Sequence, residues 1–175
     1  GPYPQAADAR GLSRPLAVTR GYREGDAPAI AALTLAAIGQ TALAAYSPDQ
    51  VAAWSARYSP ERLVAGAAKG DIIRVAVDGG DIPIAYVVLE PDGHLDMLYC
   101  HPDHTGTGLA RHLLNEVEQA ARALGLTRIL TEASELARPV FERAGYSLLH
   151  RRDFMIPFEG REVAIHNYAM EKRLA

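Results

Sequence analysis

Apolar and polar residues follow two different periods along this chain, and each period predicts one kind of element. Residues 71–78 and 82–90 are rich in Ile and Val, which is typical of strands, and Gly79-Gly80 between them predicts a hairpin. After residue 108 the apolar positions instead recur every three or four residues, which predicts a helix. These positions are Leu109, Leu113, Val117, Ala120 and Leu124. Gly125 is expected to end that helix.

Three further helices are predicted in the N-terminal half from residues that favour a helix start. Ser47 and Ser59 stand directly before a proline, Asp26 stands two residues before Pro28, and each of the three can cap a helix. Gly39 is expected to break the first of these helices, and Gly70 to end the third. The remaining strands are expected over residues 16–22, from residue 94 onward, and over residues 127–131, 146–157 and 162–172.

The order of these elements predicts an α+β fold. Several consecutive antiparallel strands come first, and the helix after residue 108 then crosses over to a parallel strand. Ser134 is expected to cap one more helix before the two final strands. The result is a mixed, mostly antiparallel central sheet with flanking helices. A single domain is expected over residues 15–175, and residues 1–14 are expected to be a flexible arm whose Gly1-Pro2 start resembles a protease-cleavage scar.

Composition narrows the function classes. The 175 residues are enough for one domain with a sizeable core. A net charge of −3 provides no field that attracts DNA, RNA or an anionic membrane, so no nucleic-acid or membrane partner is expected. No apolar run reaches the roughly 18 residues that span a bilayer. The single cysteine, Cys100, excludes a disulfide framework and indicates a reducing, cytoplasmic location.

Residues 94–114 carry the strongest chemical signal. They indicate a strand, a turn marked by Pro102, and a glycine-rich loop that opens directly into a helix. A helix start offers unpaired backbone N–H groups and a positive dipole end, which together bind anions. Gly106 and Gly108 allow the backbone to approach a ligand closely. We therefore expect this loop to bind a phosphate group of a cofactor.

Two motifs in this half of the chain together indicate a protein family. The first is Thr105-Gly106-Thr107-Gly108-Leu109-Ala110, preceded by Leu98-Tyr99-Cys100-His101-Pro102. The second is Ala137-Arg138-Pro139-Val140-Phe141-Glu142-Arg143-Ala144-Gly145-Tyr146. In this order the two motifs resemble the GNAT family of acetyl-coenzyme-A-dependent N-acetyltransferases, and the resemblance covers about residues 16–174. It implies the GNAT fold and acetyl transfer from acetyl-CoA to a primary amine.

The resemblance also implies where the cofactor lies. In this family two central strands splay apart, and the pantetheine arm of acetyl-CoA fills the gap. Backbone groups of Leu98 and Cys100 are then expected to bind the pantetheine amides, and the amides from Thr105 to Ala110 the pyrophosphate. The candidate cofactor-binding residues are Leu98, Tyr99, Cys100, Thr105, Gly106, Thr107, Gly108, Leu109, Ala110, Arg111, Ser134 and Phe141. Thr105 replaces the family's Arg or Gln and brings no charge, so weaker cofactor binding is expected.

Acetyl transfer needs a neutral amine, and therefore a group that accepts the proton of the amine. Asp96 is the preferred candidate because the resemblance places an acid on this strand, and Glu90 at the end of the preceding strand is the second. The apolar residues around Asp96 are Leu95, Leu98 and Cys100. They do not keep the two-residue alternation of a regular strand, so a β-bulge is expected near Asp96.

The departing thiolate also needs a proton, and here the sequence differs from the family pattern. The usual tyrosine aligns with Phe141, which has no proton to donate. Tyr146 matches the aromatic residue that follows the family's glycine and is expected in the core. Tyr99, Tyr168 or solvent are the remaining donors, and Tyr168 is taken as a third candidate catalytic residue.

Other reactive side chains have simpler interpretations. His94, His101 and His104 lie close in sequence but lack the spacing of a metal site, so no metal is expected. Cys100 is expected to be a small core residue rather than a nucleophile. Trp54 could wall an acceptor pocket or pack in the core, and the core is favoured.

The sequence does not identify the acceptor. The amine could belong to a small molecule, a protein lysine or a protein N-terminus, and a homodimer stays open. A non-catalytic acyl-CoA-binding domain is the main alternative, because of Thr105 and Phe141. An unrelated nucleotide-binding protein is disfavoured because no Lys-Ser/Thr pair follows the glycines.

Overall fold

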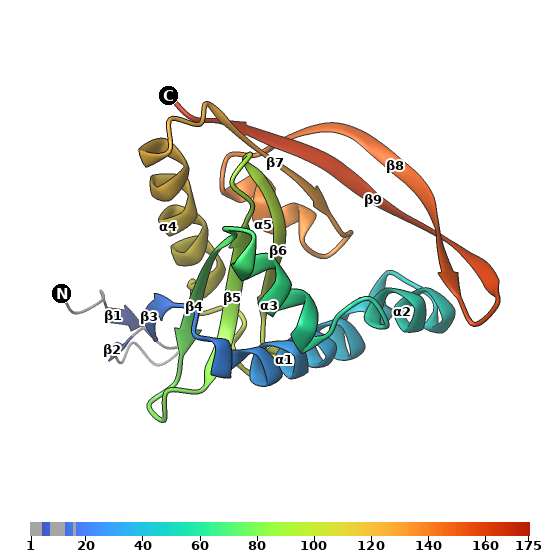
Figure 1. Ribbon diagram of the computed structural model, residues 1–175, viewed down its shortest axis with the longest axis horizontal. Coiled ribbons are helices and arrows are strands. Elements are labelled where there is room, and N and C mark those ends of the chain that lie inside the picture. The colour runs from blue at the N-terminus through green and yellow to red at the C-terminus, as the bar shows by residue number, and fades with distance from the viewer. Residues whose placement is uncertain (1–4, 8–12, 16) are drawn as a thin grey trace.

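The computed structural model describes residues 5–7, 13–15 and 17–175, and its main feature is a seven-stranded sheet with helices on both faces (Figure 1). The strand order is β3-β4-β5-β6-β7-β9-β8. The strands are β3 (Val18–Gly21), β4 (Ile72–Val77), β5 (Pro83–Leu89), β6 (His94–Cys100), β7 (Arg128–Ala133), β8 (Ser147–Phe158) and β9 (Arg161–Arg173). All neighbours are antiparallel except β6 and β7, which are parallel. The predicted mixed, mostly antiparallel α+β fold is confirmed.

Five α-helices accompany the sheet in the described part of the chain. They are α1 (Ala27–Thr41), α2 (Pro48–Ser55), α3 (Pro60–Ala68), α4 (Leu109–Ala123) and α5 (Arg138–Arg143). Helices α1 and α3 cover one face of the sheet and α4 covers the other, so every residue of β5 between them is buried. The long β8–β9 hairpin extends from the sheet beside α2 (Figure 1).

The expected N-terminal arm lies mostly outside the described residues, since residues 1–4, 8–12 and 16 are not described. Within it, β1 (Gln5–Ala7) and β2 (Ser13–Pro15) pair as a two-stranded antiparallel sheet. The first strand of the main sheet begins at Val18, inside the expected range of residues 16–22.

One local prediction about glycine was wrong. Gly39 lies inside α1 and does not break it, because the apolar residues of this helix form a continuous buried face and an exposed glycine costs only about 1 kcal/mol. The hairpin predicted at Gly79-Gly80 is confirmed, because β4 and β5 pair antiparallel, and its connection spans residues 78–82. There Asp81 adopts the positive φ, 64°. The Asp78 carboxylate accepts the N–H groups of Gly80 and Ile82, which fixes this wider loop.

One helical run also differs from the expectation that no apolar segment is long enough to span a membrane. Glu24–Ala44 has the length and mean hydropathy, 1.5, of such a helix. Its apolar residues, among them Ile30 and Leu33, pack in the core cluster beneath β4 and β5. The apolar character of this segment is therefore explained by its role as the core helix α1.

Candidate active site

Strands β6 and β7 separate soon after they meet. They pair only at His94 with Leu130 and at Leu95 with Thr131. The Thr131 hydroxyl donates to the Leu95 carbonyl at 2.9 Å and closes the end of this short ladder. From Asp96 onward β6 has only β5 as a neighbouring strand, so its other edge is not paired within the sheet. The structure thus contains the gap between central strands that the sequence resemblance predicts.

A cavity of about 390 Å³ occupies this gap. On the side of α1 to α3 it is lined by charged and aromatic residues, and on the side of α4 and α5 by Leu98, Ala137 and Phe141. The polar and aromatic lining residues that matter below are Trp54, Arg57, Tyr58, Arg62, His94, Asp96, Tyr99, Glu132, Arg152, Phe154 and Asn167. The cavity therefore connects the two faces of the sheet through the split.

Asp96 lies at the narrow end of the split as the extra residue of a β-bulge. Val88 pairs with Met97 and Leu89 pairs with Leu95, which leaves Asp96 opposite no residue of β5 and confirms the predicted bulge. Its carboxylate lines the cavity and lies 3.3 and 3.4 Å from a guanidinium nitrogen of Arg62 on α3. A bulge turns a side chain out of the regular alternation, so here it presents a partly exposed acid to the cavity.

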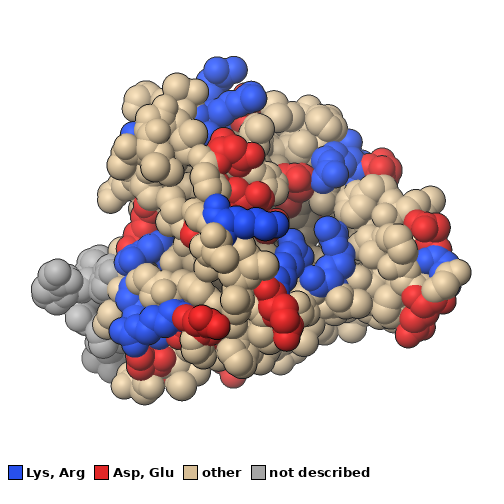
Figure 2. All heavy atoms as spheres, viewed as in Figure 1, with Lys and Arg blue, Asp and Glu red and all other residues tan. Residues whose placement is uncertain are grey.

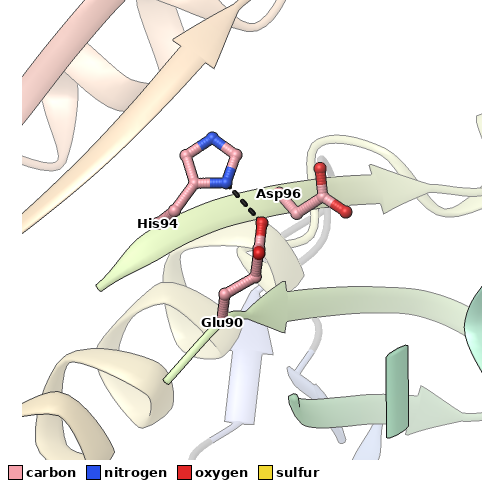
Figure 3. A group of neighbouring side chains, drawn as sticks. All are labelled: Glu90, His94 and Asp96. Carbon is pink, nitrogen blue, oxygen red and sulfur yellow. Dashed lines mark hydrogen bonds and ion pairs between the residues drawn. The ribbon is translucent and has the colours of Figure 1, made fainter. Parts of the chain in front are cut away.

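Glu90, the second candidate base, bonds a histidine and does not line the cavity. Its carboxylate bonds Nδ1 of His94 at 2.5 Å (Figure 3). Nε2 of His94 bonds Glu132 of β7 at 2.8 Å. Glu90 is not among the residues that line the cavity, whereas His94 and Glu132 are. The bonds from Glu132 and then Glu90 raise the pKa of His94 to about 9, and the His94 bond lowers the pKa of Glu132. His94 is therefore a cation that joins the two strands at the base of the split.

This bridge predicts a pH-dependent contribution to stability. The pKa of His94 rises from 6.5 to about 9 on folding, so its contribution is complete below about pH 6.5 and is lost as pH rises through 9. With its side chain 30% exposed, we expect about 1–2 kcal/mol after solvent screening. Denaturant unfolding of the wild type and of His94→Gln should differ by this amount at pH 6 and by little at pH 10.

The exposed His150 provides the matched control, because it forms no ion pair within the described residues. His150→Gln should leave the free energy of unfolding unchanged at both pH values. An equal loss of stability in His94→Gln at pH 6 and pH 10 would contradict the bridge.

Glu90, His94 and Asp96 also place one potential metal-ligand atom each within 4.8 Å of one another. In Figure 3 the Asp96 carboxylate points along β6, away from the bonded Glu90–His94 pair. Both His94 nitrogens are already bonded to carboxylates, and Arg62 places a cation against Asp96. These contacts explain the grouping without an ion, and the expected absence of a metal stays a prediction.

The glycine loop has the backbone that the sequence predicts. Gly106 and Gly108 have φ of 74° and 81°, and an added Cβ on either would meet no atom within 4 Å. Near the start of α4, the N–H of His112 bonds the Gly108 carbonyl. Among the described residues it is the first N–H of this helix that has a main-chain acceptor. The N–H groups of Leu109, Ala110 and Arg111 therefore lie free at the positive end of a 15-residue helix.

The two threonine side chains of the loop form hydrogen bonds within the loop. The Thr105 hydroxyl donates to the Pro102 carbonyl at 3.2 Å, and the Thr107 hydroxyl to the His104 carbonyl at 2.8 Å. Arg111 donates to the Arg143 carbonyl at 2.5 Å and so ties α4 to the end of α5. Cofactor binding at this loop would accordingly depend on backbone amides, with the threonines shaping the turn.

The other predicted cofactor residues lie along the split. Leu98 and Tyr99 of β6 line the cavity, as do Ser134 and Phe141. The Ser134 hydroxyl accepts the Ala137 N–H at 3.1 Å, one residue before α5, so it caps the turn that leads into the helix. Phe141 is buried against Tyr146, with ring centroids 5.0 Å apart.

Cys100 does not line the cavity, and burial raises the pKa of its thiol to about 11. A thiol that stays protonated at neutral pH is a poor nucleophile. Cys100 therefore has the properties of the small, partly buried residue that the sequence indicates.

Tyr168 is directed away from the cavity. Its hydroxyl donates to Glu135 at 2.5 Å, the Arg138 guanidinium lies 4.5 Å from its ring centre, and it is absent from the cavity lining. The bond to Glu135 raises the pKa of Tyr168. Tyr99 is better placed to reach a leaving group, since it lines the cavity and its hydroxyl lies 2.7 Å from that of Tyr58.

Sequence reasoning missed four charged residues of the site: Arg57, Arg62, Glu132 and Arg152. Arg152 of β8 donates to Asn167 at 3.2 Å and lies 3.6 Å from Glu132. They come from the turn before α3 and from α3, β7 and β8, so no single local spacing connects them. The only signal was the position of Glu132 near the end of a predicted strand beside the glycine-loop helix.

Comparison with known proteins tests the resemblance directly. The family model described as "Acetyltransferase (GNAT) domain" matches residues 42–158, which is more than half of the chain. The chain belongs to the GNAT acetyltransferase family. It is an acetyltransferase by this membership, and the split sheet is the GNAT fold.

Individual relatives agree with this assignment. A GCN5-related N-acetyltransferase structure from Rhodopseudomonas palustris is 32% identical, with a TM-score of 0.79, covering 91% of this chain and 96% of that chain. The uncharacterized N-acetyltransferase YafP of Escherichia coli is 27% identical over 133 residues, 76% of this chain and 83% of YafP. The PaiA N-acetyltransferase of Thermoplasma acidophilum, solved with coenzyme A, has a TM-score of 0.72 at 16% identity, covering 89% and 98% of the two chains.

Proposed function

We propose that this GNAT protein transfers the acetyl group of acetyl-CoA to the primary amine of a small molecule, by direct attack within a ternary complex. The observation that carries the proposal is the single cavity through the β6–β7 split. One of its sides is apolar and adjoins α5, and the other contains Asp96. Both reactants can therefore meet in one chamber, as direct attack requires.

The donor side fits a coenzyme A thioester. The unpaired edge of β6 offers main-chain groups from Asp96 to Cys100 to an amide-containing chain, and the free amides at the start of α4 suit a pyrophosphate. PaiA with coenzyme A, and YncA of Salmonella typhimurium solved with acetyl-CoA, share this fold and support the assignment. Acetyl-CoA would supply the acetyl group as an activated thioester, from which the coenzyme A thiolate leaves readily.

On the acceptor side, Asp96 would take a proton from the ammonium group of the acceptor, directly or through one water molecule, and the neutral amine would then attack the thioester carbonyl. A main-chain N–H on the free edge of β6 would stabilise the oxyanion, so no side chain is needed for that role. Tyr99 or solvent would return a proton to the thiolate. Cys100 stays protonated at neutral pH and does not line the cavity, so it offers no thiolate that could form a covalent acetyl-enzyme.

The experiment is release of coenzyme A thiol from acetyl-CoA over a panel of primary amines, with initial rates measured while both substrates vary. Intersecting reciprocal plots are expected for a ternary complex, and parallel plots would instead indicate an acetylated enzyme. Tight coenzyme A binding with no thiol release on any amine would favour the non-catalytic alternative.

Gly108→Val should weaken coenzyme A binding at least about tenfold in calorimetry. A β-branched residue is strained at a φ of 81°, so the loop must rearrange and the amides at the start of α4 lose their alignment. Gly160→Val is the matched control, because Gly160 has φ of 75° and equally open surroundings but lies in the distant β8–β9 turn. Equal affinity of the two variants would count against the loop as the phosphate site.

A further inference from the structure

The acceptor side of the cavity carries an excess of positive charge. Three arginines and two carboxylates line the cavity: Arg57, Arg62, Arg152, Asp96 and Glu132. His94, whose two carboxylate partners raise its pKa to about 9, is also a cation at neutral pH, and Glu90, which bonds it from outside the lining, balances that charge. The chain as a whole has a net charge of −3, so this excess is local to the cavity. Like charges in a partly desolvated site repel one another, and a bound anion would relieve that repulsion.

Two of these guanidinium groups are held in place by aromatic rings. Arg62 lies 4.9 Å from the centre of the Tyr58 ring, and Arg152 lies 5.3 Å from that of Phe154. Stacking of this kind fixes the plane of a guanidinium and leaves its edge donors available. Figure 2 shows Lys and Arg side chains gathered beside a hollow near the middle of the face it presents.

The arginines differ in how far their charge is already matched. Arg62 is paired with both oxygens of Asp96. Arg152 has one carboxylate oxygen, that of Glu132 at 3.6 Å, and it donates to the neutral amide of Asn167, while the other oxygen of Glu132 bonds His94. Arg57 has no ion pair among the described residues. Arg152 and Arg57 are therefore the cations whose donors remain for a ligand.

We propose, on the basis of the function above, that the acceptor is a small primary amine that also carries an anionic oxygen group such as a carboxylate. Its amine lies against Asp96 and its anionic group against Arg152, with Arg57 as a second cation. A guanidinium edge matches two oxygens of a carboxylate. The cavity of about 390 Å³ is at the small end for ligand sites and is shared with the thioester, which limits the acceptor to about the size of an amino acid.

The test compares matched acceptors that differ only in charge: ω-amino acids of two to four carbons, their carboxamides, and the corresponding alkylamines. We expect kcat/KM for the best carboxylate to exceed that of its carboxamide at least about tenfold, mostly through KM. Binding is read separately, as the thermal shift that each compound gives to the protein saturated with coenzyme A.

Substitution of Arg152 sharpens the test. Arg152→Gln should reduce the carboxylate-to-carboxamide ratio of kcat/KM about tenfold, and Arg152→Lys, which keeps the charge but not the planar fork, should reduce it less. Arg152→Glu should reverse the preference toward diamines. Arg122→Gln, on the exposed surface of α4, is the matched control and should leave the ratio unchanged.

The outcomes separate this inference from the proposed function. Thiol release with neutral amines or neutral peptides as good as with the carboxylates would overturn the anionic acceptor and leave the acetyl transfer intact. A thermal shift specific to carboxylates, lost in Arg152→Gln but without thiol release, would support the anion site and overturn the proposed reaction. If neither the turnover nor the thermal shift favours the carboxylates, the inference is rejected.

Discussion

Asp96→Asn should lower kcat for amine acetylation about 100-fold or more, while KM for acetyl-CoA changes by less than about twofold. The carboxylate is the acid that the β6 bulge presents to the cavity, and a positioned general base typically contributes a factor of at least 100. Asparagine keeps the size and the hydrogen-bond acceptor but cannot take a proton. Thiol release at saturating acetyl-CoA, measured from pH 6 to pH 10.5, is the experiment.

The pH profile distinguishes proton transfer from positioning. A primary alkylamine, like the lysine side chain, has a pKa of about 10.4, so at pH 10.5 about half of it is already neutral and needs no base. The deficit of Asp96→Asn should therefore shrink toward high pH, whereas loss of a merely structural contact would give a constant deficit. Loss of the Arg62 contact should cost at most about 1 kcal/mol of stability, because the pair is partly exposed.

Glu90→Gln is the informative control for Asp96→Asn. Both residues are candidate bases in the sequence, but Glu90 bonds His94 and lies outside the cavity lining. Its substitution should change kcat by less than about threefold at pH 7. A loss of kcat in Glu90→Gln as large as that in Asp96→Asn would contradict the assignment of the proton transfer to Asp96.

The parts of the site that follow from local sequence were predictable. The broken alternation of Leu95, Leu98 and Cys100 located the bulge at Asp96, because one extra residue must shift every later side chain to the opposite face. The glycines at 106 and 108 likewise gave the loop, since positive φ values at the start of a helix are cheap only for glycine.

Side-chain direction across the sheet was not predictable, as Tyr168 illustrates. It pairs with Ala133 and Arg151, whereas its neighbour Asn167 pairs with Arg152, which lines the cavity. Successive side chains on a strand point to opposite faces, so Tyr168 is on the face away from Arg152. That assignment depends on the β8–β9 register, which a bulge between Leu148 and His150 shifts by one residue.

Contacts between distant segments were equally hidden. Arg62 and Asp96 are 34 residues apart, and their meeting depends on α3 packing over β6. Gly39 shows the opposite case, in which tertiary packing overrides a local signal. The buried face of α1 reaches Ile38, directly before Gly39, and its packing outweighs about 1 kcal/mol of helix propensity.

The second large effect concerns the stability of the helix that follows the glycine loop, where an ion pair joins α4 to the last strand. Glu118 of α4 is 2% exposed and pairs with Lys172 of β9, and the Lys172 ammonium also donates to the Ala144 carbonyl at 2.7 Å. The second carboxylate oxygen of Glu118 is buried with no hydrogen-bond partner among the described residues. All neutralisation of this buried charge in the described structure therefore comes from Lys172.

Lys172→Met should lower the free energy of unfolding by about 3–5 kcal/mol, because it leaves the Glu118 carboxylate buried and unpaired. Denaturant unfolding checks this, with the exposed Lys69→Met as a matched control expected within about 0.5 kcal/mol of the wild type. The double variant Glu118→Leu/Lys172→Met should recover most of the loss, since it removes the buried charge together with its partner. If the double variant were as unstable as Lys172→Met alone, the loss would instead come from the contacts of Lys172 with Ala144 and the Tyr146 ring.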